Sequence, residues 1–115
     1  MPLIKMETSA PLTDTEMSTL ASALSRIAAE AIGKPESYVM AVISPSVISM
    51  AGEVGPAAFL DVRSIGGLNQ SVNREISKRV AMLLEERLNI PKNRIYLGFT
   101  SVTGAEWGYN GSTFG

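Results

Sequence analysis

Few side chains in this sequence could do chemistry, because its 115 residues include no cysteine and no histidine. The lack of cysteine excludes disulfides, thiol nucleophiles and thiolate metal sites. The lack of histidine removes the usual general base and the commonest metal ligand, and it excludes Ser-His-Asp and Cys-His arrangements. With Asp14 and Asp61 as the only aspartates, we do not expect a carboxylate metal cage. An enzyme of this composition takes its base from a glutamate, a lysine, a tyrosine or the amino terminus.

Pro2 is the first candidate. We expect Met1 to be removed because the side chain at position two is small, and Pro2 then presents a secondary amine. A free α-amino group titrates near pH ~8, and burial or a nearby cation lowers its pKa. An amine that is neutral near physiological pH is a competent general base. The alternative is that Pro2 only begins an edge strand, and a retained Met1 would leave it without a free amine.

Lys34 is the second candidate, between Gly33 and Pro35 at a predicted helix-to-strand junction. There it could face a pocket and bind a substrate carboxylate. The alternative is a solvated lysine in the last turn of the helix, where it favours the negative end of the dipole.

The turn 64–67, with the sequence Ser-Ile-Gly-Gly, and Tyr96 complete the candidates. Glycines let a ligand approach the backbone, and amides before a helix attract anions. An ordinary strand-to-helix turn is the alternative. Tyr96 either packs in the core or places its hydroxyl in a pocket at a subunit boundary.

The hydrophobic pattern predicts two strand–helix–strand units that would position these residues. The first has strands over 3–8 and 38–43 around a helix of about 18 residues, which begins at the capping box Thr13–Glu16. The second has strands over 57–65 and 94–102 around a helix that Asn69 caps and Pro91 closes.

An offset of about 56 residues aligns the two units, so residues 1–115 form one domain with an internal pseudo-repeat over about 2–50 and 58–105. The predicted fold is α/β, with a four-stranded mixed sheet and both helices on one face. The strands at 38–43, 57–60 and 95–99 are apolar on both faces. Because the helices cover only one face, another copy of the chain must cover the second, and we predict a homo-oligomer.

The charge balance excludes some partners. Ten basic residues oppose eleven acidic ones, so no basic surface favours nucleic acid or an anionic membrane. The N-terminus lacks the pattern of a signal peptide, and we expect a cytoplasmic protein. Leaderless export is possible but nothing in the sequence indicates it.

Taken together, these residues resemble the macrophage migration inhibitory factor family of the tautomerase superfamily, over essentially the whole chain. The order and spacing of several short segments carry the resemblance. They are Met1-Pro2, Thr8 with Pro11, Gly33-Lys34-Pro35 with Tyr38, Ser64-Ile65-Gly66, Asn73-Arg74, Glu86-Arg87-Leu88, Arg94-Ile95-Tyr96 and Asn110-x-Ser112-Thr113-Phe114.

The resemblance implies a homotrimer with three cofactor-free and metal-free sites at its subunit interfaces. Pro2 would be the base that moves a proton between the α-carbon and the enol oxygen of an aromatic α-keto acid such as phenylpyruvate. Lys34 would bind the substrate and keep Pro2 neutral, and Tyr96 would come from the neighbouring subunit. The implied substrate-binding residues are Tyr38, Ser64, Ile65 through its amide, Gly98, Trp107, Tyr109 and Phe114.

The sequence departs from the family pattern at several positions. Gly98 stands where an asparagine is frequent, and Arg63 and Trp107 occupy pocket-edge positions where better-known members differ. Ala57 and Leu60 replace a CxxC pair, which excludes thiol–disulfide activity. Leu12 replaces the arginine associated with receptor engagement in animal members.

Two other functions remain open. One is a signalling ligand with a vestigial pocket. The other is a tautomerase that acts on an unsaturated diacid or a halogenated acid. That chemistry needs an arginine near the base, and Arg63 is the one candidate for it.

Overall fold

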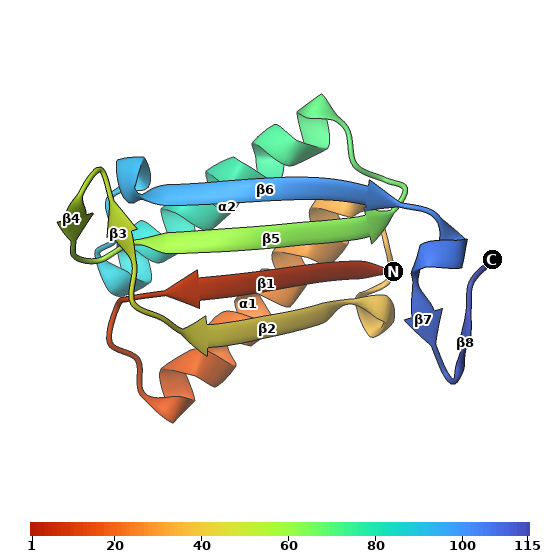
Figure 1. The fold of residues 1–115 in the computed structure, drawn as a ribbon, viewed down its shortest axis with the longest axis horizontal. Coiled ribbons are helices and arrows are strands. Elements are labelled where there is room, and N and C mark those ends of the chain that lie inside the picture. The colour runs from red at the N-terminus through yellow and green to blue at the C-terminus, as the bar shows by residue number, and fades with distance from the viewer.

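The computed structural model describes all residues, 1–115, and contains a four-stranded sheet with two helices on one face (Figure 1). The strand order is β2-β1-β5-β6, with β1 parallel to β2, β5 parallel to β6, and β1 antiparallel to β5. The sheet strands are β1 (Pro2–Thr8), β2 (Met40–Pro45), β5 (Ala58–Ile65) and β6 (Ile95–Val102), and the helices are α1 (Asp14–Ile32) and α2 (Gln70–Leu88). The predicted α/β fold of two strand–helix–strand units is confirmed.

Capping hydrogen bonds fix the start of helix α1, and a glycine fixes its end. Thr13 Oγ1 accepts the Glu16 amide at 3.1 Å, and the Glu16 carboxylate accepts the Thr13 amide at 3.2 Å. Gly33 ends the helix with φ at 78°, a left-handed conformation that favours glycine. Lys34 therefore lies beyond the helix, and the interpretation that places it in the last turn is wrong.

Helix α2 begins at the predicted cap, since Asn69 Oδ1 accepts the Val72 amide at 2.9 Å. It ends earlier than predicted. Asn89 adopts a left-handed conformation with φ at 54°, which is usual for glycine at a helix end and is sometimes adopted by asparagine. Pro91 is therefore not the terminator. It stands at the N-cap of the short 3₁₀ helix η2 (Lys92–Arg94), and β6 begins one residue later than predicted.

The core lies between the sheet and the helices. Along β1 and β5 every second residue is buried, which is the period of a strand with one covered face. Each fully buried Leu or Ile contributes about 1.5–3 kcal/mol. The largest fully buried apolar side chains are Ile4, Met6, Leu20, Leu24, Leu60, Val62, Ile76, Val80, Leu84 and Ile90.

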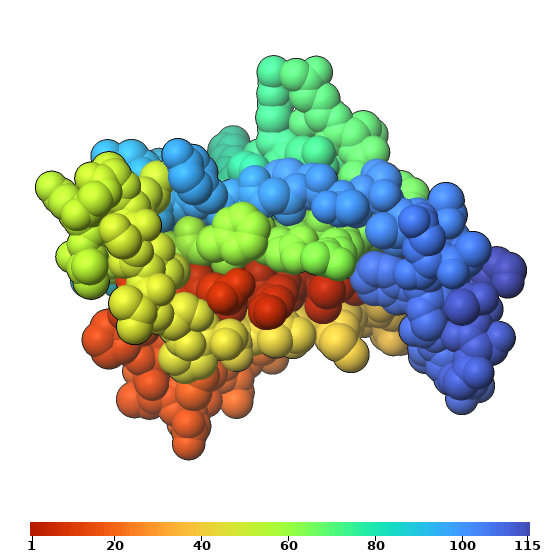
Figure 2. All heavy atoms as spheres, in the orientation of Figure 1, coloured from red at the N-terminus to blue at the C-terminus, as the bar shows by residue number.

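The second face of the sheet carries no helix (Figure 2). Met40, Phe59 and Tyr96 project from it and are 63%, 41% and 66% exposed. The face also holds the Asp61–Arg63 ion pair, with Arg63 Nη2 at 2.9 Å from Asp61 Oδ2. Strands β2, β5 and β6 thus present apolar side chains on both faces, as the sequence predicts. The second copy that would cover this face remains a prediction.

Two hairpins flank the bare face at its ends (Figures 1 and 2). One pairs β3 (Ser49–Met50) with β4 (Glu53–Val54). The other pairs β7 (Gly108–Tyr109) with β8 (Ser112–Thr113) after the 3₁₀ helix η3 (Gly104–Glu106). The C-terminal hairpin lies beside the N-terminus. Neither long helix has a stretch apolar enough to cross a membrane.

Candidate active site

A cleft of about 370 Å³ opens at the N-terminal end of β1. Three segments far apart in the sequence form it: the start of β1, the 3₁₀ helix η1 (Glu36–Tyr38) with the start of β2, and the C-terminal hairpin. Its lining residues are Met1, Pro2, Leu3, Ser37, Tyr38, Val39, Met40, Trp107, Gly108 and Tyr109. No charged side chain is among them, so the cleft walls favour an apolar group.

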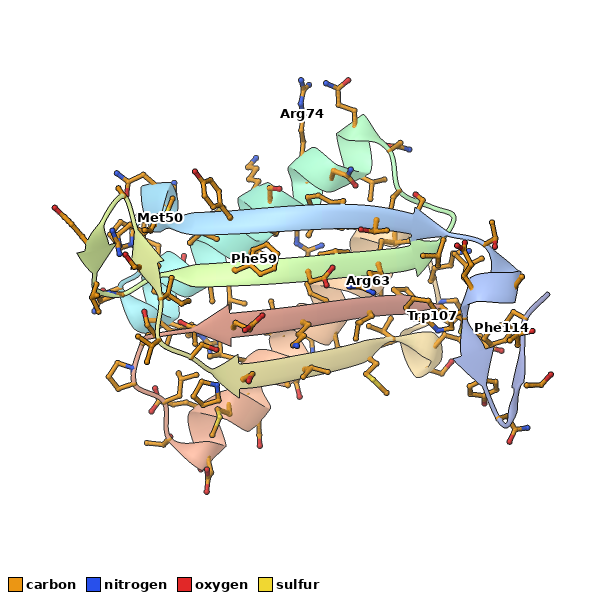
Figure 3. The ribbon with its side chains drawn as sticks, viewed as in Figure 1. Met50, Phe59, Arg63, Arg74, Trp107 and Phe114 are labelled. Carbon is orange, nitrogen blue, oxygen red and sulfur yellow. The ribbon has the colours of Figure 1, made fainter.

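Four residues predicted for the site line this cleft: Pro2, Tyr38, Trp107 and Tyr109. Phe114 lies against Tyr109, and the two rings are stacked with 5.2 Å between their centroids and 15° between their planes. Figure 3 shows Trp107 and Phe114 together on the C-terminal segment. Tyr38 belongs to η1 rather than to a strand, so the predicted strand over 38–43 begins two residues too early.

Pro2 is almost completely buried, with less than 2% of its surface exposed. In the full chain Met1 precedes it, so the amine at this position belongs to Met1. Burial, and secondly the positive charge of Lys34, lower the pKa of that amine below its usual value. Both causes favour the neutral form. The surroundings at this end of β1 therefore favour the neutral form of the terminal amine.

Lys34 does not line the cleft, but its charge acts on the amine and its side chain packs against the turn 64–67. A Cβ on Gly67 would lie 3.6 Å from Lys34 Cε and 2.6 Å from Ile32 Cγ2. Gly67 has φ at 82°. The absence of a side chain there thus permits the turn to approach Lys34, and the two predicted anion-binding features lie side by side.

Ser64 joins this turn to β1, since it is the register partner of Pro2. It is fully buried, and its hydroxyl donates to the Gly66 carbonyl at 2.7 Å. Within the chain the hydroxyl therefore shapes the turn. Ile65, the next residue, is partly exposed at the end of β5.

Tyr96 and Gly98 lie away from the cleft. Tyr96 pairs in register with Phe59, which pairs with Glu7. Glu7 is five residues from Pro2, or about 17 Å along an extended strand. Tyr96 is 66% exposed, so the alternative of a packed core tyrosine is wrong. The Tyr96 hydroxyl cannot reach Pro2 of its own chain.

Arg63 lies on the bare face (Figure 3), whereas its neighbour Ser64 points toward the helices. Its guanidinium donates to both Asp61 carboxylate oxygens. No arginine lines the cleft, and no group of three or more acidic residues lies close enough to hold a metal ion.

One motif escaped the sequence analysis. Thr103–Glu106 repeats the Thr-x-x-Glu pattern of α1, and Glu106 Oε1 accepts the Thr103 amide at 2.8 Å and hydroxyl at 2.9 Å. These hydrogen bonds, the backbone one first, lower the pKa of Glu106. The motif closes the turn immediately before Trp107 and so positions that wall of the cleft. Met40, another lining residue, carried no sequence pattern that marked it.

Comparisons with known proteins point to one family. The family described as macrophage migration inhibitory factor (MIF) matches residues 1–115. A homolog of that factor from Trichinella spiralis is 37% identical over 99% of this chain and 100% of its own. The crystal structure of the MIF-like protein from Entamoeba histolytica superposes with a TM-score of 0.94, at 37% identity and 98% coverage of both chains. The homologue from Prochlorococcus marinus gives 0.92 at 39% identity, over 98% of this chain and 99% of its own.

Proposed function

The chain belongs to the macrophage migration inhibitory factor family, and on that premise we propose that it is a keto–enol tautomerase whose general base is Pro2, freed by removal of Met1. Its substrate is a small enolisable α-keto acid with an aromatic ring, of which phenylpyruvate is the representative. The observation that carries the proposal is the coincidence of two features. An amine whose pKa is lowered by burial and Lys34 stands in a cleft with aromatic walls.

The reaction needs one base and no cofactor. When Met1 leaves, the nitrogen of Pro2 becomes a secondary amine one residue deeper in β1 than the Met1 amine. The neutral nitrogen takes the proton of the enol hydroxyl. The resulting ammonium returns a proton to the carbon beside the forming carbonyl, the one that carries the aromatic ring. The amine is regenerated and the substrate keeps its composition. General acid–base transfer of this kind contributes about 10²–10⁴-fold to a rate.

Lys34 and the turn 64–67 bind the substrate carboxylate in this proposal. The ammonium of Lys34 supplies the charge, and the amide of Ile65 supplies a hydrogen bond. Tyr38, Trp107 and Tyr109 contact the ring, with Phe114 behind Tyr109. The support is the packing of Lys34 against Gly67 and the apolar lining of the cleft.

We further propose that the protein is a cytoplasmic homotrimer in which Tyr96 of one subunit completes the site of the next. The bare face of the sheet supports this assembly, because Met40, Phe59 and Tyr96 are exposed on it. The separation of Tyr96 from Pro2 of the same chain supports an intermolecular role.

The decisive experiment combines intact mass spectrometry with an assay of phenylpyruvate enol conversion on the same sample. The expected result is a chain without Met1 that converts the enol rapidly, and a Pro2→Gly variant of unchanged oligomeric mass that loses most of the activity. A chain that lacks Met1 and turns over no α-keto acid would overturn the enzymatic proposal. Family membership would then favour the signalling role. Full activity in Pro2→Gly would overturn the proline base alone.

A further inference from the structure

Two aromatic rings stand together on the bare face of the sheet. Phe59 of β5 and Tyr96 of β6 are register partners. They are 41% and 66% exposed, and Phe59 lies on the face turned toward the viewer in Figure 3. Neither ring is stacked on another aromatic side chain, since the Tyr109–Phe114 pair is the only such contact in the chain. We call Phe59 and Tyr96 the aromatic shelf.

Gly98 explains the position of the Phe59 ring. A Cβ on Gly98 would lie 3.7 Å from Phe59 Cζ and 3.8 Å from Phe59 Cε1. The ring therefore extends along the sheet over the backbone of Gly98, at the distance of ordinary van der Waals contact. A longer side chain at position 98, such as asparagine, would compete with the ring for this space. The absence of a side chain at Gly98 thus leaves the space that the Phe59 ring occupies.

Charged side chains lie beside the shelf on the same face. Glu7 is the register partner of Phe59, and its carboxylate accepts the Ser46 hydroxyl at 3.4 Å. Asp61 is the register partner of Gly98, but its carboxylate accepts three hydrogen bonds from Arg63. Arg63 lies two residues further along β5, away from Phe59. The charges of Asp61 and Arg63 therefore offset each other, whereas the Glu7 carboxylate lies on the other side of Phe59.

From this arrangement we infer that Phe59 is a specificity-determining residue. The aromatic shelf that it forms with Tyr96 is presented by one subunit to the active site of its neighbour. The shelf selects α-keto acids with a flat aromatic ring over aliphatic or polar ones. The inference rests on the proposed function, because it uses the intersubunit role of Tyr96. It extends that function by assigning a substrate preference to Phe59 and Gly98, which lie outside the cleft of their own chain.

The magnitude follows from the chemistry of stacked rings. An aromatic pair in an offset or edge-to-face arrangement is worth about 0.5–1.5 kcal/mol beyond the area it buries. Leucine in place of Phe59 keeps much of the apolar area but removes the ring. For an aromatic substrate, kcat/KM should fall about two- to tenfold. For an aliphatic α-keto acid it should change little, because such a substrate has no ring to stack.

The experiment compares Phe59→Leu with Met82→Leu, a matched control at an apolar side chain that is 47% exposed on α2. The enols of phenylpyruvate and of a short aliphatic α-keto acid serve as substrates, and the oligomeric mass of each variant is measured first. The expected result is a two- to tenfold loss of preference for the aromatic substrate in Phe59→Leu and none in the control. Equal effects on both substrates, or no effect, would overturn the inference.

Two additions keep the outcome interpretable. If Phe59→Leu fails to assemble, Gly98→Asn tests the same space from the other strand and should cause the same loss of aromatic preference. If the wild-type protein shows no tautomerase activity, the proposed function fails and binding decides the inference. Titration with cinnamate and with a short aliphatic carboxylate should then show that Phe59→Leu weakens only cinnamate binding. An unchanged cinnamate affinity would overturn the role of Phe59.

Discussion

The turn that follows β5 allows a quantitative test of how closely the site is packed. Gly66 and Gly67 both adopt left-handed backbone conformations, with φ at 70° and 82°. Their surroundings differ. A Cβ on Gly66 would meet nothing within 4 Å, whereas a Cβ on Gly67 would lie 2.6 Å from Ile32 Cγ2. Alanine at the two positions therefore imposes the same kind of backbone strain, but only one variant adds a steric overlap.

The expected magnitudes follow from these two terms. A left-handed conformation costs a non-glycine residue about 1–2 kcal/mol, so Gly66→Ala should lower the free energy of unfolding by about that amount. Overpacking in a filled region costs a further ~1–3 kcal/mol. Gly67→Ala should therefore lose about 2–5 kcal/mol in total. Ile32 is the last residue of α1 and only 8% exposed, so it has little room to move.

Urea denaturation of the two variants and the wild type measures the difference. All three are compared at one protomer concentration, because assembly makes the apparent stability depend on concentration. The slope of the free energy against urea should be the same in each, so that the midpoint reports stability alone. Equal destabilisation by Gly66→Ala and Gly67→Ala would refute the reasoning, since it would mean that Ile32 yields without cost.

Three further outcomes are expected. Lys34→Met removes a positive charge that lowers the amine pKa, so the acid limb of the kcat/KM profile should move to higher pH. The control Lys78→Met, on the exposed face of α2, should leave that limb at the same pH. Glu106→Ala should raise KM for an aromatic substrate more than it lowers kcat. Hydrogen bonds lower the pKa of Glu106, so the stability that its carboxylate contributes is present above the unfolded pKa and is lost as pH falls through the folded value. In denaturation experiments Glu106→Ala should lack this pH dependence of stability. Co-refolding inactive Pro2→Gly and Tyr96→Ala chains in equal amounts should restore activity at about a quarter of the interfaces, whereas sites built within one chain would stay inactive.

The fold could be predicted because its determinants are local. The capping residues Thr13 and Asn69 act within three residues, and the apolar periods of the helices and strands repeat along each element. The errors fall where two short-range preferences compete. Pro35 and Pro91 each cap a 3₁₀ helix of three residues, and each predicted strand begins at the last residue of that helix, at Tyr38 and at Arg94.

The site could be predicted only in part, because its geometry depends on contacts between distant segments. Pro2 and Trp107 meet only because the C-terminal hairpin packs beside the start of β1 (Figure 1). The sequence gives no measure of that packing. Gly98 was recognised as a departure from the family, but its consequence depends on the ring of Phe59, 39 positions earlier in the chain, which only the register of β5 and β6 places above it.

In the proposed mechanism, the position of Lys34 would link substrate binding to the basicity of Pro2. Burial, and secondly the charge of Lys34, lower the pKa of the Met1 amine, and we expect the same causes to act on the Pro2 amine once Met1 is removed. A bound carboxylate near Lys34 offsets that charge, so the protonated amine becomes less unfavourable and its pKa rises. The base is thus strengthened when the substrate is present to use it. The kcat/KM profile reports the free enzyme and the kcat profile reports the complex. The acid limb of kcat should therefore lie at higher pH than that of kcat/KM, and the separation should shrink in Lys34→Met. Coincident limbs in the wild type would show that the carboxylate binds elsewhere, and that Lys34 acts on Pro2 alone.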